Sequence, residues 1–123
     1  MAKTFLAIIG LALTSLLATP AWAGSFDGLW VGEYVCRQGK TALALTIGAG
    51  PSGKPGAIFQ FSAHPKNPKV PAGSFFADAK IDAKAGSIAL KPYKWLDQPD
   101  RRYKMVALEG KLSGKNVIKG KLL

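Results

Sequence analysis

The fold is decided by the stretch Leu29-Trp-Val-Gly-Glu-Tyr-Val-Cys-Arg37 and by the segment Thr41-Ala-Leu-Ala-Leu-Thr-Ile47 that follows it. Between them lies Gln38-Gly39, a turn-forming pair. Apolar side chains alternate along both segments with a period of two, which is typical of strands, whereas a helix would repeat every three to four residues. One face of each segment is predicted to point inward: Trp30, Gly32, Tyr34 and Cys36 in the first, and Leu43, Leu45 and Ile47 in the second.

The same alternation continues toward the C-terminus, interrupted by turn residues at intervals of roughly ten positions. Residues 64–73 are predicted to be a loop, because their prolines lack the backbone N–H that a central strand donates to its neighbour. The Gly-Lys-Leu at 110–112 and 120–122 is predicted to lie in two paired strands. The pattern predicts an all-β fold, an antiparallel up-and-down meander of about seven strands that forms a small barrel or sandwich, complete or incomplete. The predicted strands are Leu29–Arg37, Thr41–Ile47, Gly56–Ala63, Ser74–Ile81, Ser87–Leu90 with an extension toward Trp95, Tyr103–Leu112 and Val117–Leu122.

The N-terminus has the three parts of a secretory signal peptide. A lysine near the start supplies the positive charge, Phe5–Leu17 is a short apolar region, and Ala21-Trp-Ala23 is a small-residue cleavage site. The apolar run is shorter than the roughly 20 residues of a membrane-spanning helix, which argues against a membrane anchor. We therefore expect residues 1–23 to be cleaved off between Ala23 and Gly24, leaving a single domain, residues 24–123, that is periplasmic or secreted.

Length and charge narrow the class of protein further. The chain has 123 residues, with 17 Lys and Arg against 7 Asp and Glu, and a formal net charge of +10. This length fits one domain and excludes a multidomain enzyme. The predicted signal peptide contains only one of the charged side chains, that of Lys3, so the mature domain stays strongly basic. A small domain of this charge attracts polyanions through long-range electrostatics and counterion release.

Residues suited to catalysis or metal binding are few. One Cys and one His exclude a Cys/His zinc cluster and an intrachain disulfide. Cys36 is predicted to be a buried apolar side chain, the alternatives being a free thiol or a disulfide to another chain. His64 is expected to be an exposed loop imidazole, and the glycine-rich stretch 48–56 lacks the Lys-Ser/Thr of a phosphate-binding loop. The carboxylates form no recognisable catalytic motif. We therefore predict a non-enzymatic protein with no cofactor and no metal.

The motif Trp30-x-Gly32-x-Tyr34-x-Cys36-x-Gln38-Gly39 is followed by Pro65-x-Asn67-Pro68-x-Val70-Pro71 and by Leu90-x-Pro92-x-x-Trp95. With these motifs the sequence resembles a poorly characterised family of small secreted bacterial β domains, found alone or appended to caspase-like peptidases. The resemblance implies an all-β fold and export, and it carries no known activity. It also implies a further strand with a Gly-Cys pair, whose cysteine would be the partner of Cys36, and this sequence contains no such segment.

Cationic and aromatic residues mix most densely between Lys91 and Lys104. Aromatic rings placed between cations stack on sugar rings or bases, so we predict a binding surface here, with the 37–38 turn beside it. Its candidate residues are Arg37, Gln38, Tyr93, Lys94, Trp95, Arg101, Arg102 and Tyr103. The alternative is that the aromatic residues belong to the core and that the lysines are solvated outward residues spread along the strands, such as Lys80, Lys104, Lys111, Lys119 and Lys121.

Taken together, these features predict a binding module of the cell envelope, with an anionic polymer or an envelope protein as its partner and no specific nucleic-acid motif. Two other classes stay open. Tyr34-Val-Cys36 superficially resembles the Tyr-x-Cys of periplasmic lysozyme inhibitors, although a basic inhibitor would be repelled by a cationic lysozyme. A barrel that holds an apolar ligand, as lipocalins do, is the other class, although about seven strands leave little interior space.

Overall fold

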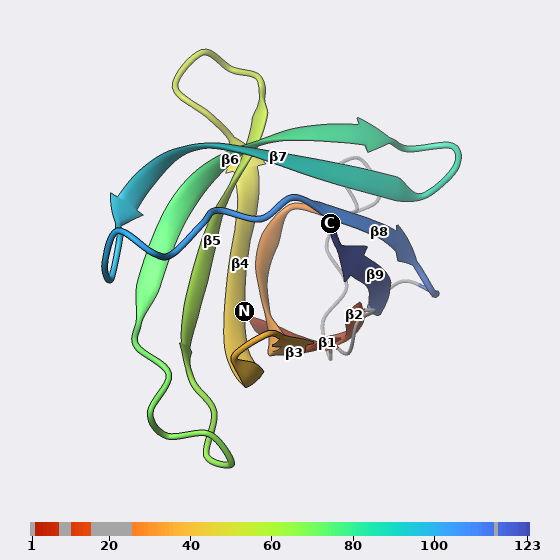
Figure 1. Ribbon diagram of the computed structural model, residues 1–123. Helices are drawn as coiled ribbons and strands as arrows, with labels where there is room; N and C mark the ends of the chain where they lie inside the picture. The colour runs from red at the N-terminus through yellow and green to blue at the C-terminus, as the bar shows by residue number, and fades with distance from the viewer. Residues whose placement is uncertain (1, 8–10, 16–25, 115) are drawn as a thin grey trace.

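The computed structural model describes residues 2–7, 11–15, 26–114 and 116–123, which form an all-β fold. One sheet curls around a central core (Figure 1). Among the described residues, no helix has the length and hydropathy needed to span a bilayer. The strands are β1 (Ala2–Ala7), β2 (Leu11–Ser15), β3 (Gly28–Cys36), β4 (Gly39–Ala49), β5 (Pro55–Ala63), β6 (Gly73–Asp82), β7 (Ser87–Asp97), β8 (Leu108–Leu112) and β9 (Ile118–Leu122).

From β3 to β9 the sheet is an up-and-down meander in which each strand pairs antiparallel with the next. This arrangement confirms the predicted fold class. Beyond β3 the sheet continues with β1, which runs parallel to β3 opposite residues 29–31, and then with β2. Both strands lie within the predicted signal peptide, and the predicted cleavage site between Ala23 and Gly24 lies outside the described residues.

The inward faces of the strands form one core that is rich in aromatic side chains. Trp30, Phe59 and Phe75 are at most 1% exposed, and the Phe59 and Phe75 rings stack with centroids 4.7 Å apart. Burying a side chain of this kind contributes about 1.5–3 kcal/mol to folding. The predicted alternation is confirmed at the buried positions Trp30, Tyr34, Leu43, Leu45, Ile47, Phe59, Phe61, Phe75, Ala77, Leu108 and Ile118.

One predicted strand is much shorter in the structure. The prediction starts it at Tyr103, whereas β8 begins at Leu108, opposite Leu90 of β7. Further along β7 lies Pro92, which has no N–H to offer a ladder, so pairing with β8 stops before it. β7 continues to Asp97 against β6 alone, with irregular register on the way. Residues 98–107 are left as a loop.

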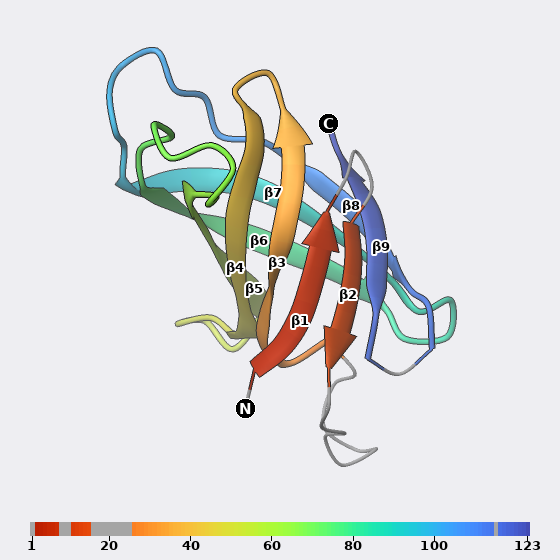
Figure 2. The ribbon, with the colours of Figure 1, turned by 90° about the horizontal axis from the view of Figure 1, so that it is seen from below.

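Three connections gather at one end of the curled sheet, which we call the mouth end (Figure 2). They are the β3–β4 turn, the β5–β6 loop of residues 64–72 and the β7–β8 loop of residues 98–107. Asn67 ties the first two together, because its Nδ2 donates to the carbonyl oxygens of Gln38 at 2.6 Å and of Lys40 at 3.2 Å. Segments that are distant in sequence therefore meet at this end.

Candidate binding surfaces

The structure divides the predicted binding surface among several places, and four of its residues meet at the mouth end. The Tyr103 hydroxyl donates to Gln38 Oε1 at 3.0 Å, which joins the 98–107 loop to the β3–β4 turn. Gln38 Nε2 in turn donates to Thr41 Oγ1 at 3.2 Å, and Thr41 is fully buried. Arg37 and Arg102 line the same cavity as Gln38 and Tyr103.

The other four predicted residues lie elsewhere. Trp95 packs against the core, where its ring meets those of Phe75 and Phe61 edge-on at 5.5 and 6.3 Å. Tyr93 is 53% exposed and stacks on Phe76 at 6.1 Å, on the outward face of the sheet. Its neighbour Lys94 is exposed, as is Arg101 in the β7–β8 loop. The stretch from Lys91 to Lys104 therefore does not form one continuous surface.

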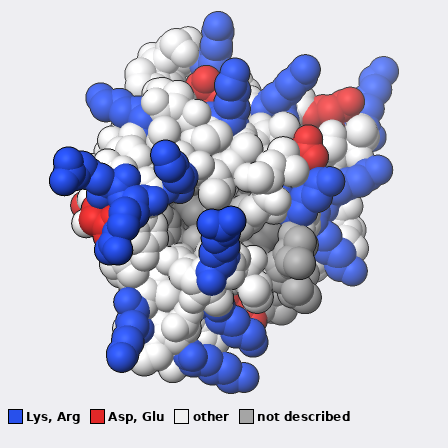
Figure 3. Space-filling view, viewed as in Figure 1, with Lys and Arg blue, Asp and Glu red and all other residues white. Residues whose placement is uncertain are grey.

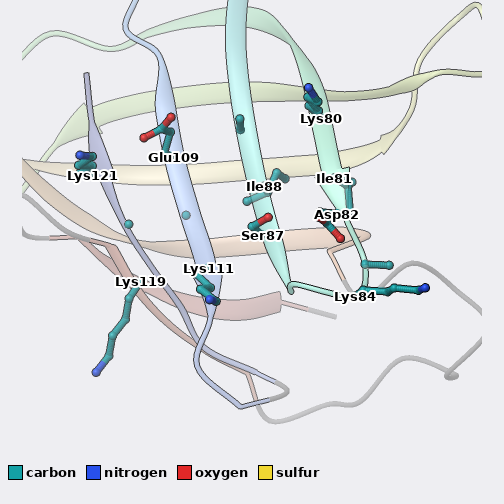
Figure 4. Close-up of a pocket in the computed structure, with 14 residues that line it drawn as sticks. Lys80, Ile81, Asp82, Lys84, Ser87, Ile88, Glu109, Lys111, Lys119 and Lys121 are labelled. Carbon is teal, nitrogen blue, oxygen red and sulfur yellow. The ribbon is translucent and has the colours of Figure 1, made fainter.

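A hollow of about 990 Å³ crosses β6, β7, β8 and β9, and we call it the lysine groove. Its side chains come from these four neighbouring strands and from the β6–β7 turn (Figure 4). Small residues lie between the long ones on β7, where Ser87 and Ala89 share the outward face with the lysines. Gly110 of β8 and Gly120 of β9 contribute only backbone atoms to the lining. Five lysines line it: Lys80, Lys84, Lys111, Lys119 and Lys121.

Strand register sets the order of the charges in the lysine groove. One row across the sheet contains Lys80, Ala89, Glu109 and Lys121, each paired with the next. A second row, two positions along each strand, contains Asp82, Ser87, Lys111 and Lys119. Side chains two positions apart on a strand share a face, so both rows project from the same side of the sheet.

The five groove lysines form no ion pair within 4.0 Å with another described residue. The ion pairs found in the described part of the chain lie elsewhere, between Lys40 and Glu33, His64 and Glu33, and Arg102 and Asp100. All five lysines are exposed, and only Asp82 and Glu109 among the lining residues are acidic. The lysine groove is therefore a concave surface with an excess of positive charge.

A second cavity, of about 640 Å³, opens at the mouth end, and we call it the aromatic mouth. Apolar side chains form most of its lining: Tyr34, Phe59, Phe61, Phe75, Tyr103, Val106 and Leu122. The lining also contains Cys36, Arg37, Gln38, Arg102 and Lys104, and it contains no acidic residue. Burial chiefly, with a smaller contribution from Cys36, raises the pKa of the Tyr34 phenol above its ordinary value, so Tyr34 is neutral here.

No nucleophile and base are paired in the described part of the chain. Cys36 is a free, half-buried thiol whose Sγ lies 3.9 Å from the Gly39 carbonyl oxygen and 4.0 Å from Thr41 Oγ1. His64 contacts the Glu33 carboxylate through Nε2 and accepts the backbone N–H of Lys66 at Nδ1. The described residues also contain no group of three His, Cys, Asp or Glu side chains arranged to hold a metal. The two surfaces are suited to binding by charge and shape.

In the alternative interpretation of the sequence, the outward lysines of β6, β8 and β9 are solvated and spread along the strands. A signal for their gathering lies in the repeated Gly-Lys-Leu at 110–112 and 120–122, because two strands of a predicted hairpin with the same pattern present their lysines on the same face. That signal does not show which strand lies beside the hairpin, and so it does not reveal the groove.

Comparison of the chain with protein-family models, with curated proteins and with solved structures finds no match. The resemblance to small secreted β domains stays a prediction, and the function is inferred from the geometry of the two surfaces.

Proposed function

We propose that this protein is an exported, non-enzymatic binding module of the cell envelope that holds an anionic polymer in the lysine groove. The observation that carries the proposal is the gathering of five exposed lysines around one concave surface. A polymer with regularly spaced charges, such as a phosphate-containing or sulfated polysaccharide, contacts several of these lysines at once and releases its counterions.

The energetics of the β8–β9 hairpin support this proposal. Lys111 is the cross-strand partner of Lys119, and like charges directly opposite one another destabilise a ladder. Neither lysine is neutralised by a described acidic side chain within 4.0 Å. The charge arrangement therefore costs stability in the free protein, and a bound polyanion would remove that cost.

The small residues between the lysines support it as well. Ser87 and Ala89, which share the outward face with the lysines, leave room for a chain to approach the sheet while the longer lysines reach it from both sides. The surrounding surface adds a general attraction, because cationic side chains are spread over the visible face and outnumber the acidic ones there (Figure 3). General attraction depends on net charge alone, whereas contact within the lysine groove depends on the lysines that line it. Variants that remove the same number of lysines inside and outside the groove therefore separate the two.

The test measures binding of the purified full-length chain to heparin and to lipopolysaccharide at a series of salt concentrations. In the triple variant Lys111→Gln, Lys119→Gln, Lys121→Gln, we expect at least tenfold weaker binding at low salt. The slope of log Kd against log salt should also become shallower by about two, since fewer counterions are released.

The matched control removes three exposed lysines outside the lysine groove, in the variant Lys54→Gln, Lys66→Gln, Lys69→Gln. A loss equal to that of the groove variant would show that only net charge matters and would refute the groove as the site. The variant Arg101→Ala, Arg102→Ala tests the loop surface expected from sequence, and a larger loss there would move the site to that loop. Absence of binding to either polymer at low salt would refute the proposed function.

Export is a separate part of the proposal, and its support is the N-terminal pattern of charge, apolar region and small-residue cleavage site. Secretion of the full-length precursor by a bacterial host should yield a chain that begins at Gly24. N-terminal sequencing of the product checks this, and an unprocessed chain retained in the cytoplasm would contradict it.

A further inference from the structure

We propose that the aromatic mouth is a second binding site, separate from the lysine groove, and that it takes an amphipathic anion with an apolar tail. None of the described residues lines both cavities. The two surfaces also differ in chemistry, because lysines and small residues line the lysine groove whereas aromatic and aliphatic side chains line most of the aromatic mouth. Each can be altered without changing the other.

The apolar part of the aromatic mouth is preformed. Tyr103 stacks on Phe61 with ring centroids 5.9 Å apart, and Tyr34 meets Phe59 edge-on at 5.7 Å. The Tyr103 hydroxyl is fixed by its hydrogen bond to Gln38, so the side chain is held both at its hydroxyl and at the face of its ring. A preformed cavity of this size lies within the range of small-molecule sites, and it binds without the entropic cost of ordering its walls.

The rim of the aromatic mouth supplies the charge that selects an anion. Arg37 and Lys104 are exposed, and neither forms an ion pair within 4.0 Å with a described acidic residue. Arg102 is different, because its Nε and Nη2 donate to the Asp100 carboxylate at 3.3 and 3.2 Å. The uncompensated charge of the rim therefore comes from Arg37 and Lys104.

The combination of these features defines the ligand class. A highly charged polymer would leave the half-buried side chains of Tyr103, Val106 and Leu122 without an apolar partner, and a neutral hydrocarbon would leave the two rim cations without an anion. A molecule with one anionic head and an apolar tail satisfies both, with its tail against Tyr103, Val106 and Leu122 and its head at the rim.

The test is calorimetric titration of the full-length chain with dodecanoate below its micellar concentration. Two further probes separate the contributions: dodecanol has the same tail without the charge, and acetate has the charge without the tail. We expect saturable binding of dodecanoate at one site per chain, at least tenfold tighter than dodecanol, and no detectable binding of acetate. Failure of dodecanoate to saturate, or equal affinity for dodecanol, would overturn the inference.

Variants locate the site. Arg37→Gln combined with Lys104→Gln should weaken dodecanoate binding at least tenfold and leave dodecanol unchanged, whereas the control Lys54→Gln combined with Lys69→Gln should change neither. Equal effects of the two double variants would refute the rim as the anion site. Saturating heparin should not displace dodecanoate, and competition between them would show one shared site. Heparin binding is measured independently of dodecanoate binding. The proposal for the aromatic mouth can therefore fail while the proposal for the lysine groove holds, and the proposal for the groove can fail while that for the mouth holds.

Discussion

Lys111 of β8 lies directly opposite Lys119 of β9 in the antiparallel ladder. Their neighbours on the strands, Gly110 and Gly120, also lie opposite each other, and Lys121 lies opposite Glu109. The contact between the glycines is close, because a Cβ added at Gly120 would overlap the Glu109 carbonyl oxygen and lie 2.7 Å from Gly110 Cα. This hairpin brings two like charges together and forms one wall of the lysine groove.

Replacing Lys111 with glutamate should stabilise the protein and weaken its binding of polyanions. The substitution turns an opposed like-charge pair into an opposite-charge pair, which is worth about 0.2–1 kcal/mol across a ladder. We expect a higher unfolding midpoint together with a loss of heparin affinity, measured by thermal denaturation and by binding at low salt. A variant that is more stable and binds heparin equally well would show that the lysine pair does not contribute to polyanion binding.

Gly120→Ala should destabilise the β8–β9 hairpin by about 1–3 kcal/mol, because backbone atoms occupy the space of the new methyl group. The free energy of unfolding in urea measures the effect. Gly48→Ala is the matched control, since a Cβ there meets nothing within 4 Å. This control should leave stability unchanged or raise it by up to about 1 kcal/mol through the loss of chain entropy in the unfolded state. Similar destabilisation by both variants would contradict the close approach at Gly120.

Asn67→Ala should loosen the mouth end. The amide joins the β5–β6 loop to the β3–β4 turn through two hydrogen bonds, and leaving the Gln38 and Lys40 carbonyls without this donor costs about 1–3 kcal/mol. We expect faster amide hydrogen exchange in the turn and weaker dodecanoate binding, because the turn contributes Arg37 and Gln38 to the aromatic mouth. Gln60→Ala, at an exposed position of β5, should change neither measurement.

Alkaline pH should lower the free energy of unfolding through Tyr34. Burial raises the pKa of this phenol in the folded state, so above the ordinary pKa of 10.0 the unfolded chain loses a proton that the folded chain retains. The stability contributed by neutral Tyr34 is complete below pH 10 and falls as the pH rises, by up to about 1.4 kcal/mol per pH unit. Urea unfolding at a series of alkaline pH values on either side of this pKa tests the decline. Tyr34→Phe should flatten it, whereas Tyr93→Phe at an exposed site should leave it intact.

Local patterns in the sequence determined the strands and their inward faces. Period-two alternation depends only on neighbours along the chain, so core positions such as Trp30, Leu45, Phe59 and Ile118 follow from the order of residues alone. Six of the seven predicted strands agree closely with β3–β7 and β9 for the same reason. The remaining predicted strand, Tyr103–Leu112, is too long, because the pairing of β8 depends on Pro92 in a neighbouring strand.

Tertiary structure alone decided which side chains share a surface. The Tyr103 hydroxyl reaches Gln38 across a separation of 65 residues. Lys80 lines the same groove as Lys111 and Lys121 because β6, β7, β8 and β9 are consecutive neighbours in the sheet. Alternation specifies which side chains of a strand point inward, but it does not specify which strand lies beside it, the register of their pairing or the path of the loops. Charge composition therefore predicts an anion-binding protein, whereas register and sheet order determine where a chain of anions and a small amphipathic anion would each fit.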